Sequence, residues 1–205
     1  MACTLVLDCS LGGLHMALAD AEGNLLFAHS DSAPRAADAL HIVLQEKLAT
    51  AGMSLADVSR FVATVGPGSF TGIRMGLAVG QALKVVNPSL QLVGVGTLEA
   101  LATGLNTHQP STTGFTIATD AAGGSVYLQT FAADGAPQTA PICLTAAEAS
   151  TDTPLFCTDL TLLPHARPLP PFNPASLLVL ADNAARHQPF TPLYVKPLAY
   201  KKALS

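Results

Sequence analysis

Tryptophan is absent from this 205-residue chain, only 5% of its residues are aromatic and 12% are charged. Hydrophobic residues make up 49%, a share that excludes the disordered and fibrous classes and allows a sizeable core. No stretch approaches the roughly 18 uninterrupted apolar residues of a membrane-spanning helix. We therefore expect a soluble globular protein of one or two domains, with no membrane partner.

The net charge and the cysteines further restrict the functions that the sequence allows. The formal net charge is -4, so there is no surplus of positive charge to neutralise a phosphate backbone, and any nucleic acid should be held by a partner. Cys3, Cys9, Cys143 and Cys157 form no CxxC pair and have no histidine at ligand spacing, which favours buried, reduced thiols. The first residues enter a strand pattern without signal-peptide features, so we expect a cytoplasmic protein.

The first half of the chain is strand-rich at its start and then alternates strands with helices. Apolar runs predict strands, and apolar residues at helical spacing predict two long helices. Thr97 is a candidate N-cap for a third helix. The predicted strands are 3–8, 14–19, 25–28, 60–65 and 91–95, and the predicted helices are 36–51, 71–86 and 97–102.

The second half begins after a polar stretch, 104–113, that is typical of a linker. We place a boundary there, giving a first lobe of residues 1–104 and a smaller second lobe of 105–205, whose C-terminal segment can pack back on the first lobe. Further strands are predicted at 115–119, 126–131 and 155–158, a proline-rich surface loop at 164–174, a helix at 175–187 and a basic tail at 196–202.

Two segments of the sequence resemble each other. Residues 6–13 and 118–124 both contain the end of a strand, an aspartate and a tight glycine turn, and each is followed by an apolar strand. Hairpins commonly carry Asp and Gly in their turns, so the pair is compatible with chance. If it reflects a duplication, the chain consists of two related lobes that face a cleft.

The segment 66–72, Gly-Pro-Gly-Ser-Phe-Thr-Gly, joins a predicted strand to a predicted helix. Backbone N–H groups at a helix N-terminus favour an anion, so a phosphate could bind there. The segment lacks the lysine and the spacing of a Walker A loop. The alternative is a tight turn in which Ser69 or Thr71 caps the helix.

Three glycines at a spacing of four residues, Gly72, Gly76 and Gly80, follow in the helix. Each costs about 1 kcal/mol relative to alanine in a helix interior, so a compensating contact is expected. Met75, Val79 and Leu83 fall on the same side, which predicts close approach of another element to this face. Packing within the domain and a subunit interface are both compatible with the pattern.

Catalytic groupings are scarce. The six histidines are scattered and form no metal-binding motif. Asp8 and Asp120 could face a cleft and act on the metal or phosphates of a nucleotide, although an aspartate at a strand end is also a common turn former. The candidate nucleotide-binding residues are Asp8, Gly66, Gly68, Ser69, Thr71 and Asp120.

Four segments together resemble the bacterial TsaB (YeaZ) family: residues 5–10, 66–76, 93–100 and 192–196. The glycine-rich segment GPGSFTGIRMG is the most specific of them. The resemblance covers most of residues 4–102 and is patchier afterwards. It implies a two-lobed α/β fold of the ASKHA (actin and Hsp70-like) type, duplicated, with a shortened second lobe.

The resemblance also implies a function. It predicts a non-catalytic dimerisation subunit that binds the paralogous TsaD and, with the ATPase TsaE, supports formation of N6-threonylcarbamoyladenosine at position 37 of tRNA. The resemblance implies no intrinsic cofactor or metal, and it assigns any bound ATP or ADP to the assembled complex. It also implies that tRNA binds only through that complex and that the chain alone forms a homodimer. The partner interface is expected on the two first-lobe helices, at Leu40, Leu44, Leu48, Gly72, Met75, Gly76, Val79, Gly80 and Leu83.

The sequence departs from the family pattern at two places. Ala36-Ala37-Asp38 stands where the family has a His-Ser/Thr-Gln/Glu pattern, and residues 120–127 lack the arginine and glutamate of the family's second-lobe motif. The chain also lacks the histidine pair that holds the metal of TsaD. The alternatives are a nucleotide-dependent small-molecule kinase or a metallopeptidase of the same fold, and a purely structural homodimer.

Overall fold

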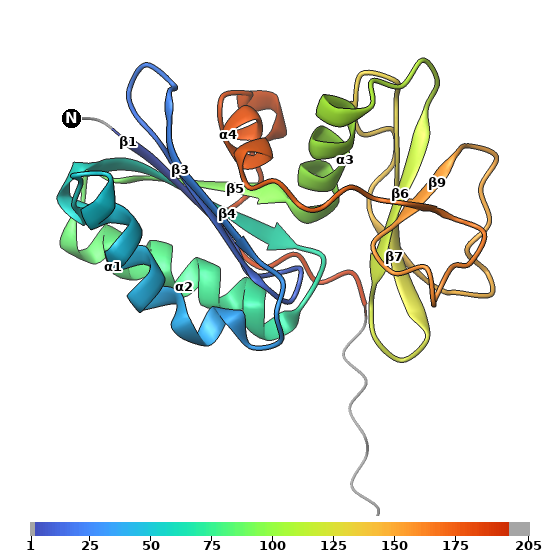
Figure 1. Cartoon of the computed structure of the whole chain (residues 1–205). Coiled ribbons are helices and arrows are strands. Elements are labelled where there is room, and N and C mark those ends of the chain that lie inside the picture. Colours follow the sequence, from blue (N-terminus) through green and yellow to red (C-terminus); the bar gives the residue numbers. More distant parts are fainter. Residues whose placement is uncertain (1–2, 197–205) are drawn as a thin grey trace, which may run out of the picture.

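The computed structural model describes residues 3–196 and contains two five-stranded sheets, one in each lobe (Figure 1). The first sheet has the order β3-β2-β1-β4-β5, and the second has the order β10-β9-β6-β7-β8. The strands of the first are β1 (Cys3–Asp8), β2 (Leu14–Ala19), β3 (Leu25–Asp31), β4 (Val58–Gly66) and β5 (Gln91–Gly96). Those of the second are β6 (Phe115–Asp120), β7 (Ser125–Phe131), β8 (Ile142–Thr145), β9 (Leu155–Cys157) and β10 (Arg167–Pro168).

The two sheets share one topology. In each, three consecutive strands form an antiparallel meander, and two later strands add in parallel beside the first strand of that meander. The expected duplication is therefore confirmed, and the similarity between residues 6–13 and 118–124 reflects equivalent hairpins. The second lobe is the shorter copy, because β9 and β10 contain three and two residues where β4 and β5 contain nine and six.

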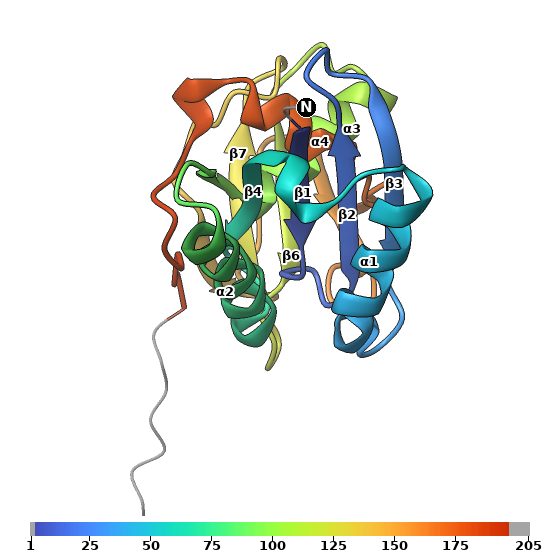
Figure 2. The ribbon, with the colours of Figure 1, turned by 90° about the vertical axis from the view of Figure 1, so that its left-hand side faces the viewer.

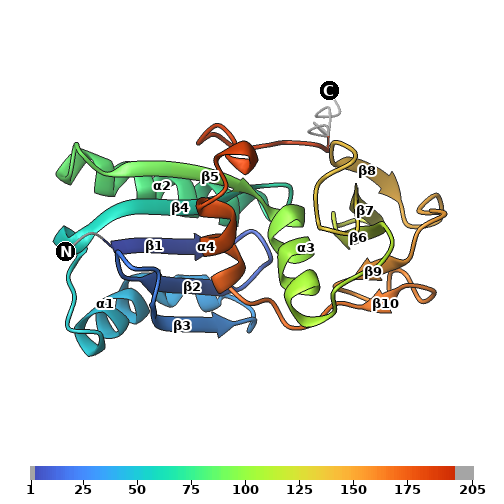
Figure 3. The same ribbon diagram turned by 90° about the horizontal axis from the view of Figure 1, so that it is seen from above.

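Helices cover both faces of the first sheet. In Figure 2, α1 and α2 cover one face, and Figure 3 shows α4 over the strands of the first sheet, with α3 between α4 and the second sheet. Helix α4 follows the second sheet in the chain yet contacts the strands of the first, while α3 contacts α4 and the strands β6 and β7. The helices are α1 (Leu40–Thr50), α2 (Phe70–Val86), α3 (Thr97–His108) and α4 (Ala175–Ala181), with 3-10 turns η1 (Ala36–Ala39), η2 (Leu55–Asp57) and η3 (Ala184–Arg186).

Coverage on both faces explains why β1 is apolar without alternation. Leu5 and Leu7 pack into the core beneath α1 and α2, whereas Val6 packs into the core beneath α4. A strand that is buried on both faces reads as a continuous hydrophobic run. The second sheet has no helix on its outer face among the described residues; the loops on either side of β9 supply Ala149 and Leu163 instead.

The glycine side of α2 packs against the chain's own first lobe. A Cβ on Gly72 would collide with the backbone oxygen of Cys9, and one on Gly80 would lie 2.6 Å from the ring of Phe190, which packs back on this lobe, and 2.8 Å from the ring of Phe61. The expectation that Gly72, Gly76 and Gly80 face a partner is therefore wrong, because the sheet itself takes up the space that the missing side chains leave.

The same correction applies to α1. Its leucines Leu40, Leu44 and Leu48 are buried in the core beneath the helix and face β1, β2 and β4 rather than a partner. Met75, Val79 and Leu83 are only half-buried and pack against the edge of that core. Of the residues expected at the interface, these three keep surface that a partner could touch.

Other predictions are confirmed or corrected in detail. Helix α3 continues to His108, so the boundary between residues 104 and 105 falls inside a helix and the division into lobes at that point remains a proposal. Thr97 is the first helical residue rather than the cap, which is Gly96. Strands β8 and β10 were not predicted. Cys3, Cys9 and Cys157 are buried free thiols as expected, and Cys143 is half-buried.

Two further points concern membrane-spanning helices and the predicted basic tail. None of the helices formed by residues 3–196 combines the length and apolar character needed to cross a bilayer. The predicted basic tail 196–202 lies, apart from Lys196, outside the described residues.

Candidate functional site

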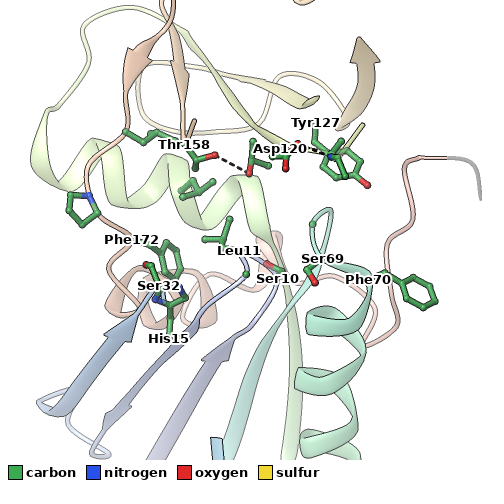
Figure 4. Close-up of a pocket in the computed structure, with 18 of the residues that line it drawn as sticks. Ser10, Leu11, His15, Ser32, Ser69, Phe70, Asp120, Tyr127, Thr158 and Phe172 are labelled. Carbon is green, nitrogen blue, oxygen red and sulfur yellow. Dashed lines mark hydrogen bonds between the residues drawn. The ribbon is translucent and has the colours of Figure 1, made fainter. Parts of the chain in front are cut away.

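A cleft of about 760 Å³ separates the lobes at the carboxyl ends of β1, β4 and β6 (Figure 4). Its walls come from the β1–β2 turn, the N-terminus of α2, the end of β6 and the segment that leads into α4. The lining is Ser10, Leu11, Gly12, His15, Ser32, Gly68, Ser69, Phe70, Leu101, Thr119, Asp120, Ala121, Ala122, Tyr127, Thr158, Leu169, Pro170, Pro171 and Phe172. Its volume suits a small-molecule ligand.

Asp8 lies behind the cleft wall rather than in it. The residue is 0% exposed, and its Oδ1 accepts hydrogen bonds from the Ser10 backbone N–H at 3.1 Å, the Ser10 hydroxyl at 2.5 Å and the Thr64 hydroxyl at 2.5 Å. The Leu11 backbone N–H lies 3.4 Å from Oδ2. The expectation that Asp8 faces the cleft is wrong; the alternative, an aspartate that organises its turn, is confirmed.

We expect Asp8→Asn to lower the free energy of unfolding by roughly 2 kcal/mol, because its amide nitrogen must replace one of the two oxygens. At Oδ1 it would lose the three bonds to that atom, and at Oδ2 it would set a second donor against the Leu11 N–H. Urea unfolding followed by circular dichroism would measure the loss. The matched control is Asp120→Asn, since Asp120 is exposed and should change stability by less than about 0.5 kcal/mol. Equal stability of Asp8→Asn and the wild type would contradict the structural role.

The glycine-rich loop is held against the β1–β2 turn. The Ser69 backbone N–H donates to the Ser10 carbonyl at 2.8 Å, and the Ser69 hydroxyl accepts from the Gly72 N–H at 3.2 Å. Ser69 is therefore the N-cap of α2, as the turn alternative predicted. Gly68 has φ 158, and a Cβ there would lie 2.5 Å from the Ser10 carbonyl oxygen, so glycine permits this close approach.

Half of the candidate nucleotide-binding residues reach the cleft. Gly68, Ser69 and Asp120 line it, whereas Asp8, Gly66 and Thr71 do not. Gly66 is buried beneath the backbone of Leu193. Because Ser69 already occupies one N–H of the first turn, the α2 N-terminus offers a bound anion fewer donors than the sequence indicated.

The described lining of the cleft lacks the positive charge that would bind a polyanion. Among the described lining residues, Asp120 is the only carboxylic acid and no lysine or arginine is present. Lys196 lies close by, but its Nζ donates to the backbone oxygens of Ala121 and Ala122 at 3.0 and 2.8 Å. This lysine stabilises the turn after β6, in which Ala122 has φ 57.

Sequence reasoning missed the lining contributions of His15 and Phe172. His15 belongs to no sequence motif, yet the hairpin register pairs it directly with Asp8, which places it at the same edge of the sheet. Phe172 lies in the predicted proline-rich surface loop, which instead forms part of the cleft wall. The predicted hairpin already pairs Asp8 with His15, and this pairing could have identified His15 as a cleft residue from the sequence.

The chain matches the family model described as "TsaD: tRNA N6-adenosine threonylcarbamoyltransferase" over residues 31–140. The chain belongs to the TsaD family. The protein "tRNA threonylcarbamoyladenosine biosynthesis protein TsaB" of Escherichia coli is 40% identical over 62 residues, which span 30% of this chain and 26% of that protein. The match thus covers about a quarter of the curated relative, in agreement with the resemblance to TsaB in the sequence.

Solved structures of TsaB-like proteins share the fold of this member of the TsaD family. "YeaZ from Pseudomonas aeruginosa" has a TM-score of 0.78 at 22% identity and covers 95% of this chain and 100% of its own. A second structure from the same organism, described as having similarity to peptidase YEAZ, has a TM-score of 0.78 at 23% identity, covering 96% and 100%. These matches confirm the two-lobed α/β fold.

Proposed function

We propose that this member of the TsaD family is a non-catalytic dimerisation subunit of the cytoplasmic complex that forms N6-threonylcarbamoyladenosine at position 37 of tRNA. The observation that carries the proposal is the family match over residues 31–140. The segment shared with E. coli TsaB supports placing the chain on the TsaB side of such a complex, opposite a TsaD-type catalytic subunit.

The contents of the cleft support a non-catalytic role. Within residues 3–196, no three or more His, Cys, Asp or Glu side chains lie together so that they could hold a metal ion, and Asp8 is buried with three structural hydrogen bonds to its Oδ1. In this proposal, the TsaD-type partner carries out the metal-dependent transfer of the threonylcarbamoyl group to tRNA. ATP or ADP acts in the assembled complex with a TsaE-type ATPase, and tRNA is bound only there.

The surface for the partner is the open side of α1 and α2, which cover the same face of the first sheet (Figure 2). Half-buried Met75, Val79 and Leu83 border it from α2. Ile42 on α1 is 51% exposed, and Ala78 on α2 is exposed. A row of apolar side chains on two helices suits packing against a second pair of helices, either of a TsaD-type partner or of another copy of this chain.

Ala78→Arg is expected to abolish co-purification with the TsaD-type subunit and threonylcarbamoylation of tRNA by the reconstituted complex. The reason is that an unpaired arginine would be buried in the contact. Size-exclusion chromatography and transfer of labelled threonine to tRNA would measure the two effects. Ala185→Arg on η3, which is also exposed but lies away from α1 and α2, is the matched control and should behave as the wild type.

Three results would contradict the proposal. Binding of Ala78→Arg with normal affinity would place the interface elsewhere. Turnover of tRNA or of ATP by the isolated chain would instead favour an enzyme, such as a small-molecule kinase of the same fold. A stable homodimer that does not bind a TsaD-type subunit would favour the alternative of a purely structural homodimer.

A further inference from the structure

The cleft contains a polar side chain, His15, that neither the fold nor the proposed function uses fully. His15 is 1% exposed and lines the cleft from the start of β2. Figure 4 shows its ring at one side of the cleft floor, close to Ser32 and Phe172. Its Nδ1 lies 2.7 Å from the Ser30 hydroxyl, whereas Nε2 has no hydrogen-bond partner within residues 3–196.

Ser30 fixes the tautomer of this histidine. The Ser30 hydroxyl donates its single proton to the backbone carbonyl of Phe172 at 3.2 Å, and a carbonyl oxygen can only accept. The Ser30 oxygen must therefore accept from His15, so Nδ1 carries the proton. Burial lowers the pKa of His15, with a smaller lowering by His29 and opposing effects of Asp8 and Asp31. In the resulting neutral ring, Nε2 keeps its lone pair.

Two neighbours hold the imidazole ring in place. A Cβ at position 13 would lie 2.7 Å from His15 Nε2, so only glycine can pack this closely against the ring. Phe172 packs edge-on against the imidazole, with 5.1 Å between ring centroids and 79° between the planes. The cleft therefore presents an oriented acceptor on a ring that is held from two sides.

The surroundings select against phosphate. A phosphorylated ligand would meet Asp120 and the Nε2 lone pair, with no lysine or arginine among the described lining residues to neutralise it. A ligand with an N–H or O–H group could instead donate to Nε2 while its apolar parts contact Leu11, Leu101 and Leu169. Such a donor would replace water at the acceptor that the ring presents to the cleft.

We propose that this cleft binds a small uncharged molecule bearing N–H or O–H donors, held by a hydrogen bond donated to His15 Nε2, and that it discriminates against phosphorylated forms of the same molecule. The site would exist in the isolated chain. It does not depend on whether the chain acts in tRNA modification.

The test uses two matched pairs of probes, adenosine with AMP and glucose with glucose 6-phosphate. The full chain, carrying ¹⁵N-labelled histidine, is titrated with each compound while the Nε2 resonance of His15 is followed by NMR. We expect at least one uncharged probe to shift this resonance toward the hydrogen-bonded position at millimolar concentration, and its phosphorylated partner to bind at least about tenfold more weakly. Tighter binding of a phosphorylated probe, or an Nε2 resonance that no uncharged probe moves, would overturn the proposal.

A variant separates ligand binding from folding. His15→Asn keeps an N–H at the position of Nδ1, and hence the bond to Ser30, but removes Nε2. We expect its melting temperature to stay close to that of the wild type and its affinity for the responding probe to fall about tenfold or more. His41→Asn, on an exposed position of α1, should leave that affinity unchanged. Unchanged affinity in His15→Asn would overturn the proposal, and the wild-type titration decides the matter if that variant fails to fold.

Discussion

Replacing Gly72 by alanine is expected to lower the free energy of unfolding by roughly 2 kcal/mol or more, the usual scale of overpacking. The added methyl group would collide with the backbone oxygen of Cys9 in the β1–β2 turn. Backbone cannot rotate out of the way, so either α2 or the turn must move. Because the loop before α2 also contacts this turn through Ser10 and Ser69, the cleft wall should be displaced as well. Chemical denaturation would measure the loss.

The same substitution four residues later is the control. A Cβ on Gly76 would meet only the Cβ of Ala63, at 3.8 Å, which is an ordinary contact. Gly76→Ala should therefore be neutral or should stabilise the chain by up to about 1 kcal/mol, since alanine is the better helix former. If both variants lost the same stability, the contacts assigned to the two glycines would be incorrect.

Arg186→Met is expected to cost about 3 kcal/mol or more of stability. Arg186 donates to Glu99 Oε2 at 2.9 Å and to the backbone oxygen of Gly135 at 2.9 Å. The side chains of Arg186 and Glu99 are only 16% and 7% exposed, so the variant would leave a carboxylate buried without its partner. These bonds join η3, α3 and a turn of the second lobe, and both the unfolding midpoint and the hydrogen exchange of α3 should report the loss.

Two comparisons make this prediction specific. The double variant Glu99→Gln with Arg186→Met should recover part of the loss, because the unpaired charge is then gone. Asp182→Asn removes the ion pair between Asp182 and Arg60, whose atoms lie 2.6 Å apart and in which the aspartate side chain is 69% exposed. This variant should lower the free energy of unfolding by less than about 1 kcal/mol. A loss as large for Asp182→Asn as for Arg186→Met would show that burial is not the deciding factor.

Much of the fold could be read from local sequence signals. Helix α2 was predicted, with Ser69 as one of two candidate N-caps, because strand, turn and helix signals occur in sequence and agree with one another. The duplicated architecture was visible as two Asp-Gly hairpins, and the resemblance to TsaB rested on contiguous segments such as residues 66–76. Strands β8 and β10 were missed because they are short and are stabilised by their neighbours in the sheet rather than by their own pattern.

The environment of each functional side chain was decided only by the tertiary structure. The glycine pattern of α2 showed that some element approaches closely, but a sequence period defines a helix face without naming what packs on it; the neighbour is the chain's own sheet. Asp8 and Asp120 end equivalent strands, yet Asp8 is enclosed by Ser10 and Thr64 whereas Asp120 is exposed to the cleft. The acceptor on His15 depends on Ser30, one strand away, and on Phe172, 142 residues after Ser30. Contacts between residues so distant in sequence leave no local pattern. For this reason the sequence by itself indicated the family and the duplicated fold, whereas only the folded chain decided the surroundings of the candidate site residues.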